Sequence, residues 1–582
     1  MATKKSNKEN LKKGNAVKTD WYKEAVVYQI YPFSYKDSNN DGIGDIEGII
    51  SKLDYIKDLG ITAIWFSPLY KSPWKDYGYD IEDYKGIHPS FGMMEDFDRL
   101  IDECHKRDIK VIMDLVVNHT SDQHEWFKKA LADKNSPYRD YYIFREGRRK
   151  GDKLLPPTNW TSSFTGSAWE RVEGTDEFYL HLFTKEQPDL NWENPEVREA
   201  VSDILIFWMD RGVDGFRLDV FNLFSKVYPF KDDRTKGSFQ KGMPFFVDGP
   251  RMHEFLKEMN EKALSKYDSY TVGETYFPDN DEAHEYIKRE NKELDTIFHF
   301  EHLAADNAGG LKYIPKPFNL VQFKKGFFEP QKRYFDDAWN TLVLENHDQS
   351  RSNSRFGIDT KKFHYEASTF LALVTFMGWG TPFIYQGEEI GMTNSDFGSM
   401  EDMRDPVSRF VFDMATKYGM PKKLAFNFIK TGARDNARVP MHWNSGVNGG
   451  FNEGAEPWQP MNSNYNEVNA EDDIASPKSI YRFYQKLLGI KKNNKTAIYG
   501  RTKEFNRKNR KVISYSRTDE NGRLLVIGNF SGKEVKYEIP SDFNPSRLKA
   551  ILTNYEYMET ARVMTLRPYE AILFEEAIGK NK

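Results

Sequence analysis

Residues 111–120 read "VIMDLVVNHT", a short apolar and β-branched run that ends in Asn118 and His119. Such a run predicts a β-strand with polar side chains at its carboxyl end. Further stretches between residues 25 and 390 share this pattern, and longer segments with helical periodicity follow them. These stretches are "VVYQIYP", "ITAIWFSP", "GVDGFRLDV", "YTVGETY", "LDTIFHFEH", "TLVLENHD" and "TPFIYQGEE".

Eight strand-like runs that alternate with helical segments indicate parallel pairing. This number favours a closed (β/α)₈ TIM barrel, although the pattern alone leaves an open doubly wound sheet possible. Carboxylates, histidines and arginines repeatedly stand at the carboxyl ends of the runs, which is where a barrel of this type builds its active site. The fold class that we predict is therefore α/β with a (β/α)₈ barrel.

Two segments depart from the barrel pattern. The connection after the third strand is rich in Tyr, Trp, Gly and Pro and is too long for a structureless loop, which indicates an inserted subdomain. After "SIYRFYQKLLGIKKNN" the sequence changes to short alternating runs, which predict a C-terminal antiparallel β-sandwich. The predicted organisation is a disordered tail (1–20), the first part of the barrel (21–119), the inserted subdomain (120–192), the second part of the barrel (193–496) and the C-terminal domain (497–582).

Composition excludes several classes of partner. A net charge of -5 over 582 residues gives no basic face for nucleic acid. No apolar run reaches the length of about 18 residues that a membrane helix needs, and the Lys-rich start has no signal-peptide core. The single cysteine, Cys104, excludes an internal disulfide and suits a reducing compartment. We therefore expect a cytoplasmic protein without membrane or nucleic-acid partners, and we expect it to be a monomer.

Three carboxylates stand at the ends of separate predicted strands: Asp219 in "GFRLDV", Glu274 in "TVGET" and Asp348 in "ENHDQSR". Each alone would more often be an ordinary salt-bridged acid, but three at strand ends should converge in a barrel. Glycoside hydrolysis requires a carboxylate pair, one ionised and one protonated. Arg217 lies two residues before Asp219 on the same strand face and should favour its ionisation, whereas a less well paired Glu274 could hold its proton.

Four segments, "DLVVNH", "GFRLDV", "VGET" and "ENHD", occur in an order that resembles the signature segments of glycoside hydrolase family 13, the α-amylase family. The resemblance runs from "WYKEAVVYQIYP" to "LRPYEAILFEE", almost the whole chain. Within the family the sequence is most similar to the oligo-1,6-glucosidases and related dextran-fragment glucosidases. The longer matches are "DSNNDGIGDIEGIISKLDYIKDLGI", "QPDLNWENPEVR", "IYQGEEIGMTN" and "RDNARVPM".

This resemblance implies a role for each polar residue. Asp219 would be the nucleophile, Glu274 the general acid and then base, and Asp348 a ligand of sugar hydroxyls that helps to distort the ring. His119 and His347 would bond hydroxyls of the glucose being released, and Arg217 would orient Asp219. An enzyme of this type retains the anomeric configuration, with its two catalytic carboxyls about 5 to 5.5 Å apart.

The resemblance also implies a pocket closed at its bottom, which would make the enzyme act on one glucose at the non-reducing end. Asp76 and Arg434 resemble the ion pair that closes it, although Arg438 could take the place of Arg434, and a structural salt bridge is the alternative. Tyr79 would stack on the sugar. Phe164 and Gln187, from the inserted subdomain, would be further pocket wall, or part of the core.

Residue 220 favours one linkage. Val220 follows the nucleophile, and relatives that cut α-1,6 bonds typically have valine there. Discrimination of this kind rests on pocket shape and is worth about 1 to 3 kcal/mol. Glu345 stands where oligo-1,6-glucosidases usually carry Asn, beside the expected leaving-group subsite, and it leaves an α-1,4-glucosidase or a sucrose-active glucosyltransferase or isomerase open as alternatives. A non-catalytic binding module fits less well, because all three carboxylates are present.

The stretch "DSNNDGIGDIEG", residues 37–48, has the alternating oxygen side chains of a calcium loop. It is not an EF-hand, because the twelfth position is Gly48 and the preceding segment is strand-like. The resemblance implies one structural Ca²⁺, with Mg²⁺ as an alternative and no organic cofactor. Its ligands would be Asp37, Asn39, Asp41, Asp45 and the carbonyl of Ile43; a turn held by Asx hydrogen bonds without metal is the competing interpretation.

Overall fold

The computed structural model describes residues 17–164, 166–236, 240–277, 280–308, 311–358, 360–556 and 560–577. Most of the predicted disordered tail, residues 1–16, therefore lies outside the described residues. Lys18 and Thr19, which belong to the same prediction, do have partners: Lys18 pairs with Asp295 at 3.4 Å, and the Thr19 amide donates to Asp268 at 2.9 Å.

All eight predicted strands are present in one sheet, which confirms the (β/α)₈ fold class. Their order is β13-β12-β11-β5-β2-β1-β17-β16. The strands are β1 Val27–Ile30, β2 Ala63–Phe66, β5 Lys110–Leu115, β11 Gly215–Leu218, β12 Tyr270–Gly273, β13 Thr296–Ile297, β16 Thr341–Val343 and β17 Thr381–Tyr385.

The chain divides into two compact units. The first comprises residues 1–21, 66–101 and 110–297, and the second comprises 22–65, 102–109 and 298–582. In the first unit, β11 pairs in parallel with both β5 and β12, with Arg217 opposite Asp114 and Leu218 opposite Gly273. This register places the residues that follow β11 and β12 at the same end of the sheet.

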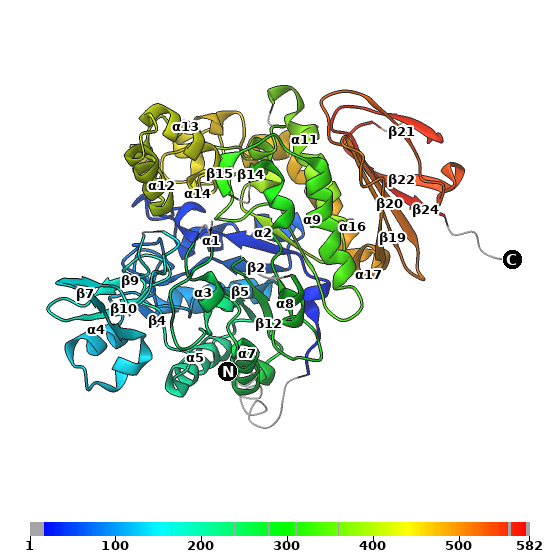
Figure 1. Cartoon of the computed structure of the whole chain (residues 1–582). Coiled ribbons are helices and arrows are strands. Elements are labelled where there is room, and N and C mark those ends of the chain that lie inside the picture. The colour runs from blue at the N-terminus through cyan, green and yellow to red at the C-terminus, as the bar shows by residue number, and fades with distance from the viewer. Residues whose placement is uncertain are drawn as a thin grey trace, which may run out of the picture. The chain divides into compact units, whose positions relative to one another are not determined.

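Helices and short strands complete the first unit (Figure 1). The helices are α4 Glu125–Ala132, α5 Pro195–Asp210, α6 Met243–Phe246, α7 Met252–Lys262 and α8 Asn280–Glu285, and α3 Met94–Lys106 crosses into the second unit. The short strands are β3 Tyr70–Lys71, β4 Asp83–Ile87, β6 Phe144–Glu146, β7 Arg148–Lys150, β8 Lys153–Leu155, β9 Trp169–Arg171 and β10 Glu177–Leu180.

The long connection after the third barrel strand has its own sheets and core, as the sequence predicts. Strands β6, β10 and β9 form an antiparallel sheet, and β7 pairs with β8. Trp160, Trp169 and Leu180 are buried in a hydrophobic cluster that also contains Val220 from the end of β11. The residue after the expected nucleophile is therefore part of the core of the inserted subdomain.

The second unit contributes the remaining barrel elements. Its helices are α1 Ile46–Ser51, α2 Leu53–Leu59, α9 Leu320–Arg333, α10 Ser352–Arg355, α11 His364–Phe376, α12 Pro406–Lys417, α13 Lys422–Gly432, α14 Asp435–Arg438, α15 Ala470–Ala475, α16 Ile480–Asn493 and α17 Lys495–Tyr499. A two-stranded sheet joins β14 Asn307–Ala308 to β15 Leu311–Pro315. In the ranges that the structure covers, no helix has the length and apolarity to cross a membrane.

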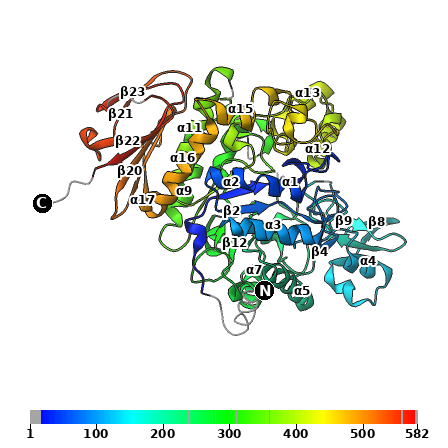
Figure 2. The same ribbon diagram turned by 180° about the vertical axis from the view of Figure 1, so that it is seen from behind.

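The C-terminal segment is the antiparallel β-sandwich that the alternating runs predict. Five strands pair in the order β18-β19-β20-β24-β22, and β21 pairs with β23 in a second sheet. Strands β20 to β23 are labelled in Figure 2. Leu525, Phe574, Tyr537 and Leu566 from the two sheets share one hydrophobic cluster. The strands are β18 Arg501–Phe505, β19 Val512–Thr518, β20 Arg523–Asn529, β21 Val535–Glu538, β22 Leu548–Thr553, β23 Val563–Leu566 and β24 Ala571–Glu576.

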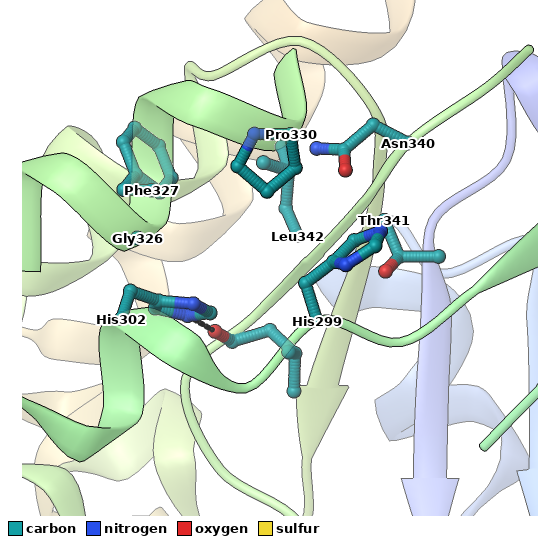
Figure 3. A pocket seen from close by; sticks show the side chains of 9 residues that line it. His299, His302, Gly326, Phe327, Pro330, Asn340, Thr341 and Leu342 are labelled. Atoms are coloured by element: carbon teal, nitrogen blue, oxygen red, sulfur yellow. Dashed lines mark hydrogen bonds between the residues drawn. The ribbon is translucent and has the colours of Figure 1, made fainter. Parts of the chain in front are cut away.

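A cavity of about 10 Å³ lies beside β16 and α9, with His299 and His302 in its wall (Figure 3). His302 Nε2 donates to the carbonyl of Val343 at 2.7 Å, whereas His299 Nε2 and Asn340 Oδ1 are buried without a hydrogen-bond partner. A space of this size holds about one water molecule, and these polar atoms could bind it. Burial lowers the pKa of His302 to about 4 and that of His299 to about 3.

The neutral state of His302 predicts a pH-dependent contribution to stability. Because its pKa is lowered in the folded state, the unfolded chain takes up a proton below about pH 6.5 that the folded chain does not. The contribution of His302 should therefore fall by about 3 kcal/mol between pH 7 and pH 4. The glutamine of His302→Gln can still donate to Val343 but does not titrate. In urea unfolding from pH 7 to pH 4, the free energy of unfolding of wild type should therefore fall relative to that of the variant.

The comparison with the variant is needed because buried carboxyls act in the opposite direction. Burial raises the pKa of Asp80 to about 7 and that of Asp114 to about 6, so both bind protons in the folded state and oppose the trend in the whole protein. A constant difference in free energy of unfolding between the two proteins from pH 7 to pH 4 would contradict the prediction.

Candidate active site

Arg217 in β11 is the centre of the carboxylate cluster in the first unit. Its Nη1 donates to Asp114 at 2.6 Å and to Asp219 at 2.7 Å, and its Nη2 donates to Glu274. The three carboxylates come from the adjacent strands β5, β11 and β12 or from the residues directly after them. One guanidinium therefore binds three acids, two of which are the predicted catalytic pair.

The charges around Arg217 offset the cost of burying it. Burial lowers the pKa of Arg217, but the charges of Asp114, Glu274 and Asp219 together raise it well above its ordinary value. Burial raises the pKa of Asp114 to about 6, and its pairing with Arg217 limits that rise. Arg217 therefore stays charged, and it favours the ionised form of the carboxylates that it binds.

Glu274 and Asp219 share the same guanidinium. The sequence left open that Glu274 could hold its proton if it were less well paired; in the structure both carboxylates accept from Arg217. The reason is the register, which sets Leu218 opposite Gly273 and so brings the next residue of each strand to the same guanidinium. The contact between Arg217 and Asp219 is confirmed; the catalytic roles of the two acids stay predictions.

Four predicted sugar-binding residues form a network beside this cluster. Tyr79 donates from its hydroxyl to Asp114 Oδ2 at 3.0 Å, and His119 Nε2 donates to the carbonyl of Tyr79 at 3.0 Å. Gln187 Nε2 donates to Asp76 Oδ2 at 3.2 Å and to the Tyr79 carbonyl at 3.2 Å. The structure thus brings Asp76, Tyr79, His119 and Gln187 together.

The loop that carries Asp76 is held by a neighbouring acid. Asp80 accepts from the amides of Lys75 at 2.8 Å and Asp76 at 3.0 Å and from the hydroxyl of Ser72 at 2.9 Å. Burial raises the pKa of Asp80 to about 7.

Burial lowers the pKa of His119 to about 4, so this imidazole is neutral at pH 7 and can both donate and accept.

Phe164 and Val220 form an apolar part of the same unit. The ring of Phe164 lies 5.4 Å from that of Phe183, which is 5.1 Å from the ring of His119. Val220 has φ 35° and ψ 41°, a left-handed conformation that a β-branched residue rarely adopts and that costs about 1 to 3 kcal/mol. The side chain of Val220 is buried in the hydrophobic cluster of the inserted subdomain.

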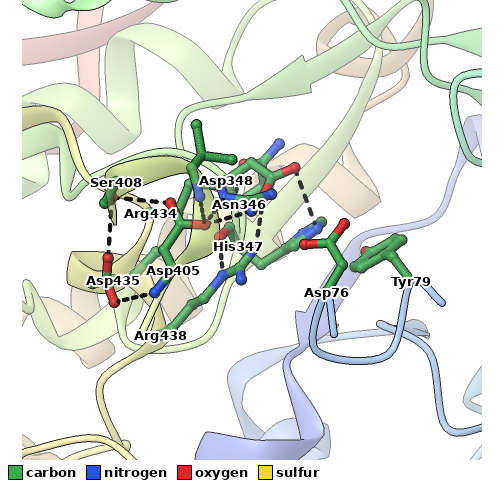
Figure 4. Close-up of polar contacts among 12 residues, drawn as sticks. Asp76, Tyr79, Asn346, His347, Asp348, Asp405, Ser408, Arg434, Asp435 and Arg438 are labelled. Carbon is green, nitrogen blue, oxygen red and sulfur yellow. Dashed lines mark hydrogen bonds and ion pairs between the residues drawn. The ribbon is translucent and has the colours of Figure 1, made fainter. Parts of the chain in front are cut away.

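In the second unit, Asp348 is fixed by two arginines (Figure 4). Its Oδ1 accepts from Arg434 Nη1 at 3.1 Å and from Arg438 Nη2 at 2.9 Å. Arg434 also binds the buried Asp405, at 2.5 Å. The side chain of Asp348 is 26% exposed, whereas those of both arginines are almost fully buried. The carboxylate is therefore held from the protein side and remains accessible.

His347 lies next to Asp348 and is anchored separately. Its Nδ1 lies 2.8 Å from Gln29 Nε2, its carbonyl accepts from Arg438 Nε at 3.0 Å, and its Nε2 lies 3.4 Å from Asp348 Oδ2. Gln29 is a buried polar residue inside the apolar strand β1. Its hydrogen bond fixes the orientation of the imidazole.

The predicted ion pair of Asp76 with Arg434, or with Arg438 in its place, would join residues of the two separately described units, and it stays a prediction. The convergence of Asp348 with Asp219 and Glu274 also stays a prediction for that reason.

Sequence reasoning missed several residues that the structure places in these networks. Asp114 was inside the quoted segment "DLVVNH" at a strand end, so its position gave a usable signal. Asp405 and Gln29 had weaker signals: Asp405 caps α12 from a loop, and Gln29 is a lone polar residue in an apolar run.

Glu345, which the sequence analysis singled out, is buried, and Arg351 and Ser352 bind its carboxylate.

The acids of the predicted calcium loop bind the loop itself. Asp37 accepts from the amides of Asn40 at 2.7 Å and Gly42 at 2.8 Å, and Asp45 accepts from the amides of Ser38 at 2.7 Å and Gly48 at 2.6 Å. Asp45 thereby caps the start of α1.

Asn39 and Asp41 complete this set of turns. Asn39 Oδ1 accepts from the Asp41 amide at 3.0 Å, and Asp41 Oδ1 accepts from the Ile43 amide at 2.9 Å. Among the described residues, no group of three or more His, Cys, Asp or Glu side chains is placed to hold a metal ion. These hydrogen bonds hold the loop together with contacts from outside it, such as that of Asn452 with Asp37 at 3.0 Å, and the calcium set stays a prediction.

Comparison with known proteins gives the family. A model described as "Alpha amylase, catalytic domain" matches residues 29–500, and one described as "Alpha-amylase SusG C-terminal domain" matches residues 512–573. The chain belongs to the α-amylase family. The resemblance seen in the four signature segments is therefore confirmed, and with it the enzyme class, a glycoside hydrolase.

Relatives match this family member over nearly its full length. It is 45% identical over 560 residues to the oligo-1,6-glucosidase of Parageobacillus thermoglucosidasius, covering 95% of this chain and 99% of that protein. The crystal structure of the trehalose-6-phosphate hydrolase of Bacillus licheniformis matches with a TM-score of 0.90 at 43% identity, covering 96% and 100% of the two chains. That of the isomaltulose synthase of Protaminobacter rubrum has a TM-score of 0.92 at 36% identity, covering 96% and 99%.

The role of Arg217 in this family member can be tested with Arg217→Lys. A lysine keeps one charge but cannot bind three carboxylates with a planar fork, so the value of kcat/KM for p-nitrophenyl α-glucoside should fall about 100-fold. The acidic limb of the pH–rate profile should move to higher pH, because the carboxylates lose part of their stabilisation.

The matched control for this substitution is Arg198→Lys. Arg198 binds Glu258 at 2.5 Å and the carbonyl of Trp192 at 2.7 Å, in the same unit but outside the carboxylate cluster. This variant should keep its kcat/KM. Equal activity of the two lysine variants would contradict the central role of Arg217.

Proposed function

We propose that this glycoside hydrolase is a retaining, exo-acting α-glucosidase that cleaves α-1,6-glucosidic bonds at the non-reducing end of isomaltose and isomalto-oligosaccharides. The observation that carries the proposal is the sharing of one guanidinium by Asp219 and Glu274. Carboxyls held by the two Nη atoms of one arginine are close to each other, as a double displacement needs.

The proposed reaction gives the two acids the roles that the family resemblance implies. Asp219 attacks the anomeric carbon and forms a covalent glucosyl ester, while Glu274 gives its proton to the leaving oxygen. Glu274 then takes a proton from water, the water attacks the same carbon, and Asp219 is released. Because Arg217 binds both carboxylates, it stabilises the ionised state that Asp219 needs at the start and that Glu274 reaches after its proton transfer.

Glucose recognition is assigned to the network around Tyr79. Asp76, His119 and Gln187 offer fixed donors and acceptors for sugar hydroxyls, and Asp348 and His347 offer more from their own network. The exo mode rests on the proposed ion pair that closes the pocket. The wall that Phe164 and Val220 contribute would be apolar and would suit the carbon faces of the sugar.

The α-1,6 preference is supported by Val220 and by the similarity to an oligo-1,6-glucosidase. Val220 directly follows Asp219, has a strained backbone and is buried in the hydrophobic cluster of the inserted subdomain. Three alternative activities need to be compared with this one. The relative named trehalose-6-phosphate hydrolase suggests a phosphorylated disaccharide as substrate. A sucrose-active enzyme and an α-1,4-glucosidase are the other two alternatives.

The proposal predicts that isomaltose has the highest kcat/KM in a panel with maltose, sucrose and trehalose 6-phosphate. Glucose should be the only product from isomaltose, and ¹H NMR should show the α-anomer first, because two displacements restore the configuration. Asp219→Asn should abolish turnover of every substrate. A higher kcat/KM for another substrate, or new disaccharides from sucrose, would show that the proposed substrate is wrong. The proposed double displacement would still stand.

We further propose that the protein is a cytoplasmic monomer with short oligosaccharides as its partners. The lone cysteine, Cys104, is buried, which is compatible with a reducing compartment.

For the loop at residues 37–45 we propose one structural Ca²⁺, or Mg²⁺ in its place. Oxygen side chains are the ligands that such hard cations prefer. After treatment with chelator, calcium at 100 times its Kd should raise the free energy of unfolding by about 2.7 kcal/mol. Asp41→Asn keeps an acceptor for the Ile43 amide but loses the charge, so its response should be weaker. Identical unfolding with and without either metal would show that the hydrogen bonds alone hold the loop.

A further inference from the structure

Glu345 directs its carboxylate into the protein. The residue follows β16 closely and is 3% exposed. Its Oε1 accepts from the amide and the hydroxyl of Ser352, both at 2.7 Å, and its Oε2 accepts from Arg351 Nη1 at 3.0 Å. Both oxygens are thus bound by residues of the same loop, at the start of α10.

Arg351 extends this contact to the next strand of the sheet. Its side chain is fully buried, and its Nη1 also donates to the carbonyl of Gln386, at 2.8 Å, directly after β17. Its backbone amide donates to Asn394 Oδ1 at 2.9 Å. Burial, followed by the charge of Glu345, raises the pKa of Glu388 well above its ordinary value. Glu345 is the carboxylate that contacts the Arg351 guanidinium, at 3.0 Å.

The segment between these anchors carries Asp348. Glu345 and Ser352 stand at the two ends of a loop, seven positions apart. Two hydrogen bonds between them close this loop. Inside the loop, Asn346 Oδ1 accepts from the Asp348 amide at 2.8 Å. Asp348, which meets Arg434 and Arg438 (Figure 4), therefore lies in the loop that Glu345 and Ser352 close.

We propose that Glu345 is a positioning residue for Asp348. Through Ser352 and Arg351 it fixes the loop from which Asp348 reaches the sugar, and it does not touch substrate. This assigns the unusual acid of "ENHD" to the protein side of the site, not to the leaving-group subsite. The inference rests on the role of Asp348 in the proposed function.

The test is a double-mutant cycle of Glu345→Gln and Asp348→Asn, with p-nitrophenyl α-glucoside as substrate. Glutamine keeps the volume of Glu345, but it removes the countercharge of Arg351 and offers Ser352 fewer acceptors. A displacement of about 1 Å at a reacting group costs about 100-fold in rate, so kcat should fall by this factor with a smaller change in KM. In the Asp348→Asn background, Glu345→Gln should cause almost no further loss, because it acts only through Asp348.

Asp473→Asn is the matched control. The carboxylate of Asp473 accepts from the amides of Ile480 and Tyr481, at 3.0 and 2.9 Å, and from the hydroxyl of Ser479 at 2.9 Å, so it holds the start of α16 as Glu345 holds α10. This variant should lower Tm and leave kcat unchanged. If Glu345→Gln does not fold, Ser352→Ala removes one donor only and should give the same non-additive cycle with a several-fold effect.

Three results would overturn the inference. Losses that multiply in the double variant would mean that Glu345 acts independently of Asp348. A changed ratio of kcat/KM between two natural disaccharides in Glu345→Gln would mean direct contact with the leaving group. A lower Tm with unchanged kcat would mean a purely structural role. Since p-nitrophenyl α-glucoside reports glucosidase chemistry whatever the natural linkage, an error in the proposed substrate would not alter the cycle.

Discussion

The first unit depends on one buried guanidinium that three carboxylates share. Burial of several like charges is costly unless each is paired and hydrogen-bonded, and Arg217 supplies this to Asp114, Asp219 and Glu274 at once. The parallel register of β5, β11 and β12 makes the sharing possible, because it aligns the ends of three strands. The same contacts therefore serve stability and the proposed chemistry.

In the second unit, Asp348 is bound in a different way. Asp348 receives two arginines on one oxygen, and Arg434 brings a further acid, Asp405. The first unit thus sets three acids on one arginine, and the second sets two arginines on Asp348. In the proposed function, Arg217 serves the two acids that exchange a proton and a glucosyl residue, and the two arginines of the second unit hold Asp348 in a fixed position.

Local sequence patterns were sufficient to predict the strands. They were not sufficient to predict which residues bind the acids. All eight barrel strands, the inserted subdomain and the sandwich follow from runs whose period and length are local properties. The pairing of Glu274 with Arg217 depends on the register between β11 and β12, which no single stretch encodes. Asp45 is an example of the same limit: the alternating oxygens gave no sign that it caps α1 by accepting from the Gly48 amide, and its role as a metal ligand stays a prediction.

The left-handed backbone of Val220 has a consequence for protein engineering. A substitution made to test the proposed role of Val220 in linkage specificity also changes the cost of an already strained conformation. Glycine would relax the backbone but would leave a hole in the cluster around Trp160, while isoleucine or threonine would keep the strain and alter the packing. The proposed determinant of specificity is therefore also a determinant of stability, and a library at position 220 is best screened for both together.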